Sequence, residues 1–284
     1  MTETITTFQP SFMQKLLGQN YKWWYLMVVS VKSDTTYFSQ NIFYIFSAVI
    51  NNLLFILVWY INFLSGSTIL SLQEIVHYFI VGALVSSILY ADNATWFLAK
   101  HIQTGSLSSI LLRPTSFFKW MFFSDLGRSF LQMLIQVSFT LVLLGLANYF
   151  LPISLNLFSI LAFALLLIIS RLMQFLISIL QGLSAFWFTE IWGLTSIVSN
   201  FWTLSSGQMF PLHVLTNFFN VFIFTFFLPF PFLFYYPTQI YLGKYSQLET
   251  LYVFLGGIAW CVVLYFLAKW VFKMGLKRNE SVGL

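Results

Sequence analysis

The chain has 284 residues, of which 59% are hydrophobic, 21% aromatic and only 7% charged. A soluble domain typically carries about 25% charged residues. A protein this apolar cannot cover its hydrophobic surface in water, so the composition excludes a soluble fold and indicates an all-α integral membrane protein. The formal net charge of +5 raises nucleic-acid binding as an alternative, but the placement of the charges argues against it.

Six long apolar blocks account for most of the sequence. A helix of about 20 residues crosses the roughly 30 Å hydrocarbon core of a bilayer, because each residue adds about 1.5 Å. The blocks therefore predict six transmembrane helices, at residues 41–63, 74–98, 128–150, 155–181, 190–206 and 251–272. Length and block count lead us to expect a single membrane domain over residues 1–284, with no additional soluble domain.

The positive charges fall almost entirely on one side of these blocks when the N-terminus is placed in the cytoplasm. The residues on that side are Lys15, Lys22, Lys32, Lys100, Arg113, Lys119, Arg128, Lys269, Lys273, Lys277 and Arg278. Lys244 lies on the outer side and Arg171 lies inside a span. Cytoplasmic loops carry such an excess of positive charge, so we expect both termini in the cytoplasm and no nucleic-acid partner. Because the sequence shows no cleavable signal and no Arg- and Ser-rich leader, we expect a bacterial plasma membrane.

The segment before the first predicted span, residues 1–40, combines helically spaced apolar residues with scattered lysines. Trp23, Trp24 and Tyr25 follow them. This pattern predicts a helix that lies in the membrane interface. The helix serves either as a plain topology anchor or as a cytoplasmic contact for a partner.

The longest outer connection, residues 207–250, is itself apolar. Its Phe-rich run holds about 15 residues before Pro229, fewer than the roughly 20 that a span requires. Pro229, Pro231 and Pro237 would also interrupt a helix that continued through them. We therefore predict two short re-entrant half-helices that enter the outer leaflet and return, covered by protein or lining a cavity.

Polar side chains recur at helical spacing on three of the predicted spans, and each set lies on one helix face. The sets are Arg128, Gln132, Gln136 and Thr140; Arg171, Gln174, Ser178 and Gln181; and Gly193, Ser196, Asn200 and Thr203. Polar groups are costly in hydrocarbon, so these faces are expected to contact other helices or to line an internal route. Arg171 lies too deep in its span to reach the interface. We predict that it pairs with Glu190 or Asp92, as a structural clamp rather than a proton relay.

Catalytic and metal-binding patterns do not stand out in the sequence. His77, His101 and His213 are scattered without metal-ligand spacing, and no Ser/His/Asp set or carboxylate pair is visible. Cys261 is the one cysteine, which rules out an intrachain disulfide or a thiolate cluster, and we interpret it as apolar filler. The sequence also lacks a phosphate-binding Walker motif, so if ATP drives this protein, another polypeptide binds it.

The two long connections carry motifs that identify a family. The cytoplasmic one, within residues 99–127, reads Ile102-Gln103-Thr104-Gly105-Ser106-Leu107-Ser108-Ser109-Ile110-Leu111-Leu112-Arg113-Pro114. The outer one contains Met209-Phe210-Pro211, Pro229-Phe230 and Tyr236-Pro237-Thr238-Gln239-Ile240-Tyr241-Leu242-Gly243. In order, spacing and topology, these segments resemble the permease subunits of the type-2 ABC transporter family over essentially the whole chain. The chain departs from the family pattern at Ser106, where an acidic residue is frequent, and at Thr238, where a small residue is common.

The resemblance implies a role for each segment. The inner loop would be a coupling helix that docks on a separate nucleotide-binding subunit through Gly105, Leu107, Ile110, Leu111, Arg113 and Pro114. The N-terminal helix would pack beside it. The outer segment would form half-helices that cap the pathway, with a gate at Pro229, Pro231, Tyr236, Pro237 and Gly243.

The resemblance also implies an assembly. Two permeases, identical or paralogous, and two ATPase subunits would combine in the lipid bilayer, and the route would follow the interface between the permeases. ATP and Mg would bind to the ATPase partner, so this chain would bind no cofactor and would not itself be an enzyme.

The loop residues fit the coupling role physically. Gly105 allows a tight bend that a side chain would obstruct, and the proline after Arg113 gives the short helix a rigid exit. Leu107, Ile110 and Leu111 would offer an apolar knob to a groove on the partner, and Arg113 would pair with a carboxylate there. A solvated turn that merely joins two spans is the alternative.

We therefore expect the permease subunit of an ATP-driven exporter. It would move an amphipathic or hydrophobic substrate, such as a lipid, peptide or drug, out of the cytoplasm or the inner leaflet. An ion-coupled secondary transporter would need titratable groups near the midplane, and an intramembrane enzyme would need a nucleophile and a base; neither stands out. A non-transporting membrane or immunity protein stays open as an alternative.

Overall fold

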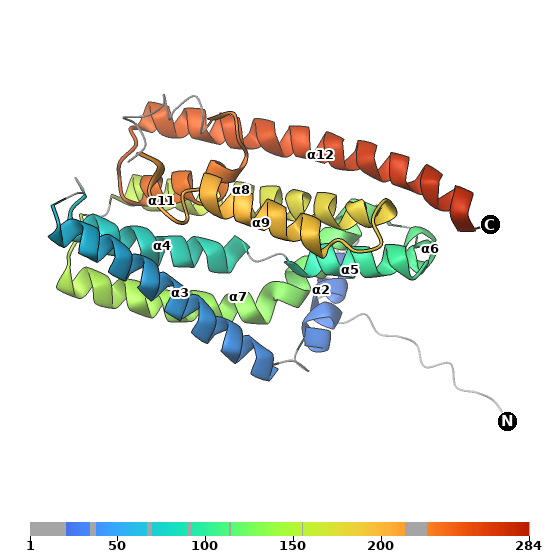
Figure 1. The fold of residues 1–284 in the computed structure, drawn as a ribbon, viewed down its shortest axis with the longest axis horizontal. Helices are drawn as coiled ribbons and strands as arrows, with labels where there is room; N and C mark the ends of the chain where they lie inside the picture. Colours follow the sequence, from blue (N-terminus) through green and yellow to red (C-terminus); the bar gives the residue numbers. More distant parts are fainter. Residues whose placement is uncertain are drawn as a thin grey trace.

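The computed structural model describes residues 21–34, 38–66, 70–89, 92–113, 115–154, 156–213 and 226–283. All regular elements in these ranges are helical. In chain order they are α2 (Tyr21–Asp34), α3 (Phe38–Leu64), α4 (Leu72–Leu89), α5 (Asp92–Gln103), α6 (Leu107–Leu111), α7 (Phe117–Phe150), α8 (Leu157–Leu183), η3 (Ser184–Phe186), α9 (Trp192–Ser205), η5 (Phe230–Leu233), α11 (Tyr235–Tyr241) and α12 (Gln247–Gly283). Most of the long helices run side by side along the long axis of the molecule, with α12 along one edge (Figure 1).

Four helical stretches are long and apolar enough to cross a membrane. They are Leu72–Gln103, which includes α4 and α5, and Phe117–Phe150, Leu157–Phe186 and Gln247–Arg278. Helix α3 adds a shorter apolar stretch, Ile50–Leu64. Helix α9 has 14 residues, fewer than the roughly 20 that a span requires. The described part is therefore all-helical with four candidate spans, and the first and fifth of the six predicted spans stay predictions.

The helix that contains the predicted third span begins before that span. Helix α7 starts at Phe117 rather than at residue 128. Residues 117–127 were assigned to the cytoplasmic connection because they contain charged residues. One of these, Asp125, is instead fully buried and pairs with Arg171 inside the bundle. A helix of 34 residues is about 51 Å long, so α7 extends well beyond the roughly 30 Å apolar layer of a bilayer.

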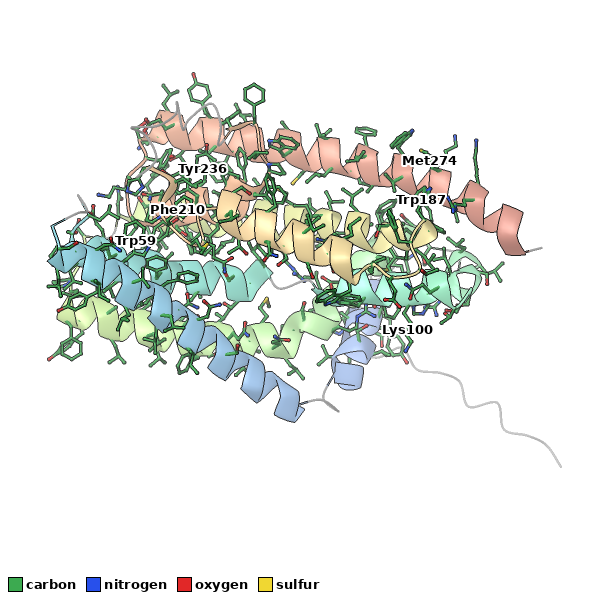
Figure 2. The ribbon with its side chains drawn as sticks, viewed as in Figure 1. Trp59, Lys100, Trp187, Phe210, Tyr236 and Met274 are labelled. Carbon is green, nitrogen blue, oxygen red and sulfur yellow. The ribbon has the colours of Figure 1, made fainter. Side chains whose placement is uncertain are left out.

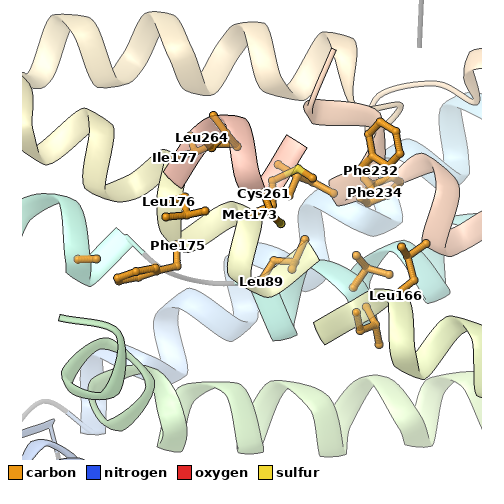
Figure 3. Packing of buried hydrophobic residues seen from close by; sticks show 14 of the residues in the cluster. Leu89, Leu166, Met173, Phe175, Leu176, Ile177, Phe232, Phe234, Cys261 and Leu264 are labelled. Atoms are coloured by element: carbon orange, nitrogen blue, oxygen red, sulfur yellow. The ribbon is translucent and has the colours of Figure 1, made fainter. Parts of the chain in front are cut away.

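Helix α8 lies at the centre of the packing, in contact with α4, α5, α11 and α12. Leu166 and Met173 of α8 are fully buried, and Cys261 and Leu264 lie on the neighbouring helix α12 (Figure 3). The thiol of Cys261 is 3.6 Å from the carbonyl oxygen of Ile169 and belongs to the buried apolar cluster. This position agrees with the interpretation of Cys261 as apolar filler.

The connections predicted for opposite sides of the membrane lie at opposite ends of the molecule. Lys100 is near one end, which contains α6, whereas Trp59 and Tyr236 lie toward the other, which contains α11 (Figure 2). We call these the α6 end and the α11 end. At the α6 end, the rings of Phe117 and Phe272 stack with 4.3 Å between centroids. The last part of α12 therefore lies beside the start of α7, as expected if the C-terminus and the inner loop share one side of the membrane.

Helix α2 packs against α7. Trp23 stacks on Phe123 with 5.3 Å between ring centroids. Gly127 makes the close approach possible, because a Cβ at this position would collide with the backbone at Met27. The part of the predicted interfacial helix before residue 21 lies outside the described residues, and a position of α2 in the membrane interface stays a prediction.

Candidate functional site

The connection between α5 and α7 holds the predicted coupling motif. After α5 ends at Gln103, the chain bends at Gly105, whose φ of 70° lies in the left-handed region. A Cβ at Gly105 would meet no atom within 4 Å, so glycine is needed here for its backbone conformation and not for space. Helix α6 follows the bend. The predicted bend is confirmed, and a side chain would obstruct it through strain in its own backbone rather than through contact with a neighbour.

Helix α6 has a buried face and an exposed end. Leu107 and Ile110 are only 1% and 4% exposed and belong to the apolar core. Leu111 is 40% exposed and Leu112, which follows the helix, is 86% exposed. The prediction that Leu107 and Ile110 offer a docking knob is therefore wrong, because these side chains anchor α6 to the bundle. The apolar tip consists of Leu111 and Leu112, and sequence reasoning missed Leu112.

Arg113 closes the loop against α7. Its guanidinium lies 4.8 Å from the ring centroid of Trp120, a distance at which cation–π attraction operates. The amide nitrogen of Thr115 donates to the Arg113 carbonyl oxygen at 2.7 Å. Pro114 lies outside the described residues, so its predicted role as a rigid exit stays a prediction.

Helix α5 is also connected to the segment that precedes α9. Nε2 of Gln103 donates to the carbonyl oxygen of Thr189 at 2.7 Å. Helix α5 packs along α8 and against η3 as well. Helix α5 therefore lies between α6 on one hand and α8 and the approach to α9 on the other.

A buried ion pair joins α7 and α8. Nη2 of Arg171 lies 2.7 Å from Oδ2 of Asp125 and 3.0 Å from Oγ of Ser129. Nη1 of Arg171 donates to the carbonyl oxygen of Leu89 at 3.0 Å. Leu89 is the last residue of α4, so the cation lies at the negative end of that helix and satisfies a carbonyl group that helix ends leave without an intrahelical donor. One side chain thus connects α4, α7 and α8 where the first candidate span divides into α4 and α5.

The sequence predicted Glu190 or Asp92 as the partner of Arg171. Within the described residues, Glu190 is exposed in the connection before α9 and forms no ion pair with Arg171, so this alternative is wrong. The side chain of Asp92 lies outside the described residues, and that alternative stays a prediction. Asp125 was missed because it was assigned to a loop, although its spacing of four residues from Ser129 indicated a shared helix face.

The polar faces predicted on the third and fourth spans point largely into the bundle. Their buried members include Gln132, Thr140, Gln174 and Ser178. Gln136 is half-buried, and its carbonyl oxygen accepts a hydrogen bond from Thr140 Oγ1 at 2.8 Å. The guanidinium of Arg128 lies 3.7 Å from the ring centroid of Phe97 on α5. These contacts agree with the expectation that the polar faces meet other helices.

The residues predicted as an outer gate surround η5 and α11. Pro229, Pro231, Tyr236 and Pro237 are buried, whereas Gly243 is exposed and has a φ of 70°. The two short helices fit the expectation that prolines prevent a continuous span here. Residues 214–225 lie outside the described residues. Re-entry into the outer leaflet and gating of a pathway stay predictions.

Two long-range hydrogen bonds attach the chain after α9 to the first spans. The hydroxyl of Tyr78 donates to the carbonyl oxygen of Gly207 at 2.6 Å in a buried position. Nε1 of Trp59 donates to the carbonyl oxygen of Met209 at 3.2 Å. These contacts link α3 and α4 to the start of the predicted outer segment.

Charged and titratable groups gather at the same end. Lys244, which follows α11, forms an ion pair with Glu74 in the first turn of α4. Nε2 of Gln239 donates to Nδ1 of His213 at 3.2 Å. Burial lowers the pKa of His213, an effect that the Glu74 carboxylate opposes and the Lys244 ammonium reinforces. The neutral imidazole is the form that accepts the Gln239 hydrogen bond.

The fold and these contacts define a multi-pass helical membrane protein with buried polar contacts between its helices. A family model described as ABC-2 family transporter protein matches residues 46–283. The chain therefore belongs to the ABC-2 transporter family, whose members are membrane transport components that work with ABC ATPase subunits. This confirms the resemblance found in the sequence. No curated protein and no solved structure matches the chain.

Proposed function

We propose that this chain is the permease subunit of an ATP-driven exporter and that α6 docks on the nucleotide-binding subunit. The observation that carries the proposal is the exposed pair Leu111 and Leu112, supported by the buried pair Leu107 and Ile110. An apolar tip on a fixed base suits a groove on a soluble partner, because binding energy concentrates where apolar side chains are removed from water. Arg113, exposed beside the tip, adds a cation for a partner carboxylate.

Contacts inside the bundle support a route from this loop to the spans. Helix α5 packs on α8, and on α8 Arg171 holds both the end of α4 and Asp125 of α7. Packed helices joined by buried polar contacts carry energetic coupling between distant sites. ATP binding would bring the two ATPase subunits together and move both loops. The outward-open state would then bind substrate less tightly than the inward-open state, which is the condition for pumping.

We infer an assembly of two permeases, identical or paralogous, with two ATPase subunits that bind ATP and Mg. Helices α3 and α9 carry large apolar side chains that such an assembly would cover. The exposed ones include Leu53, Leu57, Ile61, Ile197, Phe201 and Leu204. The transport route would follow the permease interface, in a bacterial plasma membrane with both termini in the cytoplasm. The proposed substrate is an amphipathic or hydrophobic molecule.

Charge substitution at the tip tests the docking role. Leu112→Asp should reduce copurification with the ATPase subunit at least tenfold and abolish substrate-stimulated ATP hydrolysis. Leu248→Asp is the matched control, since Leu248 is 61% exposed in the first turn of α12, away from α6. Normal copurification and coupling in Leu112→Asp would contradict the assignment of α6.

Vesicles test the energy source. An exporter of this kind should move substrate only when the ATPase subunit and ATP are both present. Transport at full rate by vesicles that contain this chain alone, driven by an ion gradient without nucleotide, would favour the secondary transporter and overturn the proposal.

A further inference from the structure

A cavity of about 290 Å³ lies between α5, α8, α9 and η5, and its lining includes neither the α6 tip nor the ion pair of Arg171. Its polar lining brings together the sets predicted on the fourth and fifth spans. That lining includes Thr95, Gln174, Gln181, Ser196, Asn200 and Thr195. The cavity is thus the place where two helix faces, each polar in the sequence, meet across an open space.

The lining is polar but carries no charge. None of the described residues that line the cavity is acidic, basic or a histidine. Its polar groups are amides and hydroxyls, and both kinds can donate as well as accept hydrogen bonds. A ligand with a fixed charge would have no counter-ion here and would lose its hydration on entry. The lining therefore selects against phosphate, carboxylate and ammonium groups.

Two buried polar atoms of the lining have no hydrogen-bond partner. Oε1 of Gln174 is such an acceptor and Nε1 of Trp202 such a donor, and both residues line the cavity. Gln174 is only 4% exposed. Buried polar groups are nearly always satisfied by protein or by bound molecules. The protein therefore leaves part of the polar wall beside the cavity unsatisfied.

The remaining polar groups show how the site is held open. Thr95 Oγ1 donates to the carbonyl oxygen of Ser178 at 3.0 Å and lies 3.3 Å from Oε1 of Gln181. This contact fixes α5 to α8 on one side of the cavity. Trp96 of α5 and Trp192 of α9 also line the cavity and are 46% and 69% exposed. Tryptophan supplies an apolar face together with an N–H donor and favours the depth at which lipid headgroups meet the acyl chains.

We propose that this cavity binds the uncharged, hydroxyl-bearing headgroup of an amphipathic molecule, such as a neutral glycosylated lipid. The hydroxyl groups exchange hydrogen bonds with the amides that line the cavity, those of Gln174, Gln181 and Asn200. The acyl chains stay in the bilayer along the exposed faces of Trp96 and Trp192. The identification of this molecule as the transported substrate rests on the proposed exporter function, whereas its binding does not.

Binding is tested on the full chain in nanodiscs of phosphatidylcholine that contain either monoglucosyl diacylglycerol or phosphatidylglycerol. Native mass spectrometry of the released protein measures which lipid is retained. We expect the glucosyl lipid to be retained at least fivefold over phosphatidylglycerol. Gln174→Leu and Asn200→Leu should each remove this preference. Gln136→Leu, a glutamine of α7 outside the cavity, should keep it.

The proposed site would be overturned if the unmodified chain retained the two lipids equally. It would also be overturned if the preference for the glucosyl lipid survived both Gln174→Leu and Asn200→Leu. Asn200 is exposed, so its variant keeps the test valid if Gln174→Leu fails to fold. Addition of the ATPase subunit separates the two proposals. Selective binding without acceleration of ATP hydrolysis by the glucosyl lipid would leave the site intact and overturn its assignment as a substrate site. Failure of the ATPase to associate at all would count only against the exporter.

Discussion

Arg171 and Asp125 lie on adjacent helices, α8 and α7, and their side chains meet 2.7 Å apart with 8% and 0% of their surfaces exposed. A buried cation is tolerated only when an anion and hydrogen-bond acceptors replace its water. The carbonyl oxygen of Leu89 supplies one of these acceptors at the end of α4. The pair therefore joins α4 and α7 to α8 through one side chain.

Replacing Asp125 with Asn should lower the free energy of unfolding by about 3–5 kcal/mol, because it leaves the Arg171 cation buried without this anion. The double variant Asp125→Leu with Arg171→Met removes both charges and should recover most of the loss. Thermal unfolding of the detergent-solubilised protein measures both. Glu190→Gln, at an exposed carboxylate, should leave the midpoint unchanged. If the double variant were as unstable as Asp125→Asn, the ion pair would not be the cause of the loss of stability.

Replacing Gly105 with Ala should weaken coupling to the ATPase. A residue with a Cβ at a φ of 70° costs about 1–2 kcal/mol, and the loop would relieve this strain by changing the direction of α6. Gly66 is a matched control, since its φ is 68° and a Cβ there also meets no atom within 4 Å, but it follows α3 at the α11 end. Substrate-stimulated ATP hydrolysis should fall in Gly105→Ala and not in Gly66→Ala. The same rates in both variants would contradict the prediction.

The apolar spans were the most predictable part of the fold. The lipid core demands a continuous apolar run for each crossing, and the runs of α8 and α12 are read directly from the sequence. The start of α7 was not predictable in this way. A charge satisfied by a tertiary partner looks the same in sequence as a charge in a loop, and nothing local to Asp125 shows that Arg171 lies opposite it.

The predicted coupling loop was likewise predictable only in part. Gly105 was predictable because glycine takes a positive φ at little cost. The directions of Leu107 and Ile110 were not, because a helix of five residues has too few turns for periodicity to show which face meets the bundle. That choice depends on how α5 and α7 approach each other, which only the tertiary structure determines.

Acidification should destabilise the α11 end through His213. Its pKa in the folded protein lies below the ordinary value of 6.5, chiefly because it is buried. As the pH falls below about 6.5, the unfolded chain takes up a proton before the folded chain does. The stability that the neutral imidazole contributes is therefore present above that pH and is lost as the pH falls through the folded-state pKa.

The variant His213→Gln isolates this effect, because glutamine can still bond to Gln239 but does not titrate. The drop in unfolding temperature between pH 7.5 and pH 5 should be smaller in His213→Gln than in the unmodified protein. An identical drop in the two proteins would show that His213 does not titrate differently on unfolding.

The hydroxyl of Tyr78 provides a test of the link between α4 and the predicted outer segment. Tyr78→Phe removes the 2.6 Å hydrogen bond to the Gly207 carbonyl oxygen and leaves that buried acceptor without its donor, at a cost of about 1–3 kcal/mol. Tyr149→Phe is the control, because Tyr149 is 81% exposed and the change should be neutral. Because Gly207 lies directly after α9, limited proteolysis should cut the segment after residue 207 faster in Tyr78→Phe. Unchanged cleavage with a lowered unfolding temperature would place the loss of stability elsewhere than in this segment.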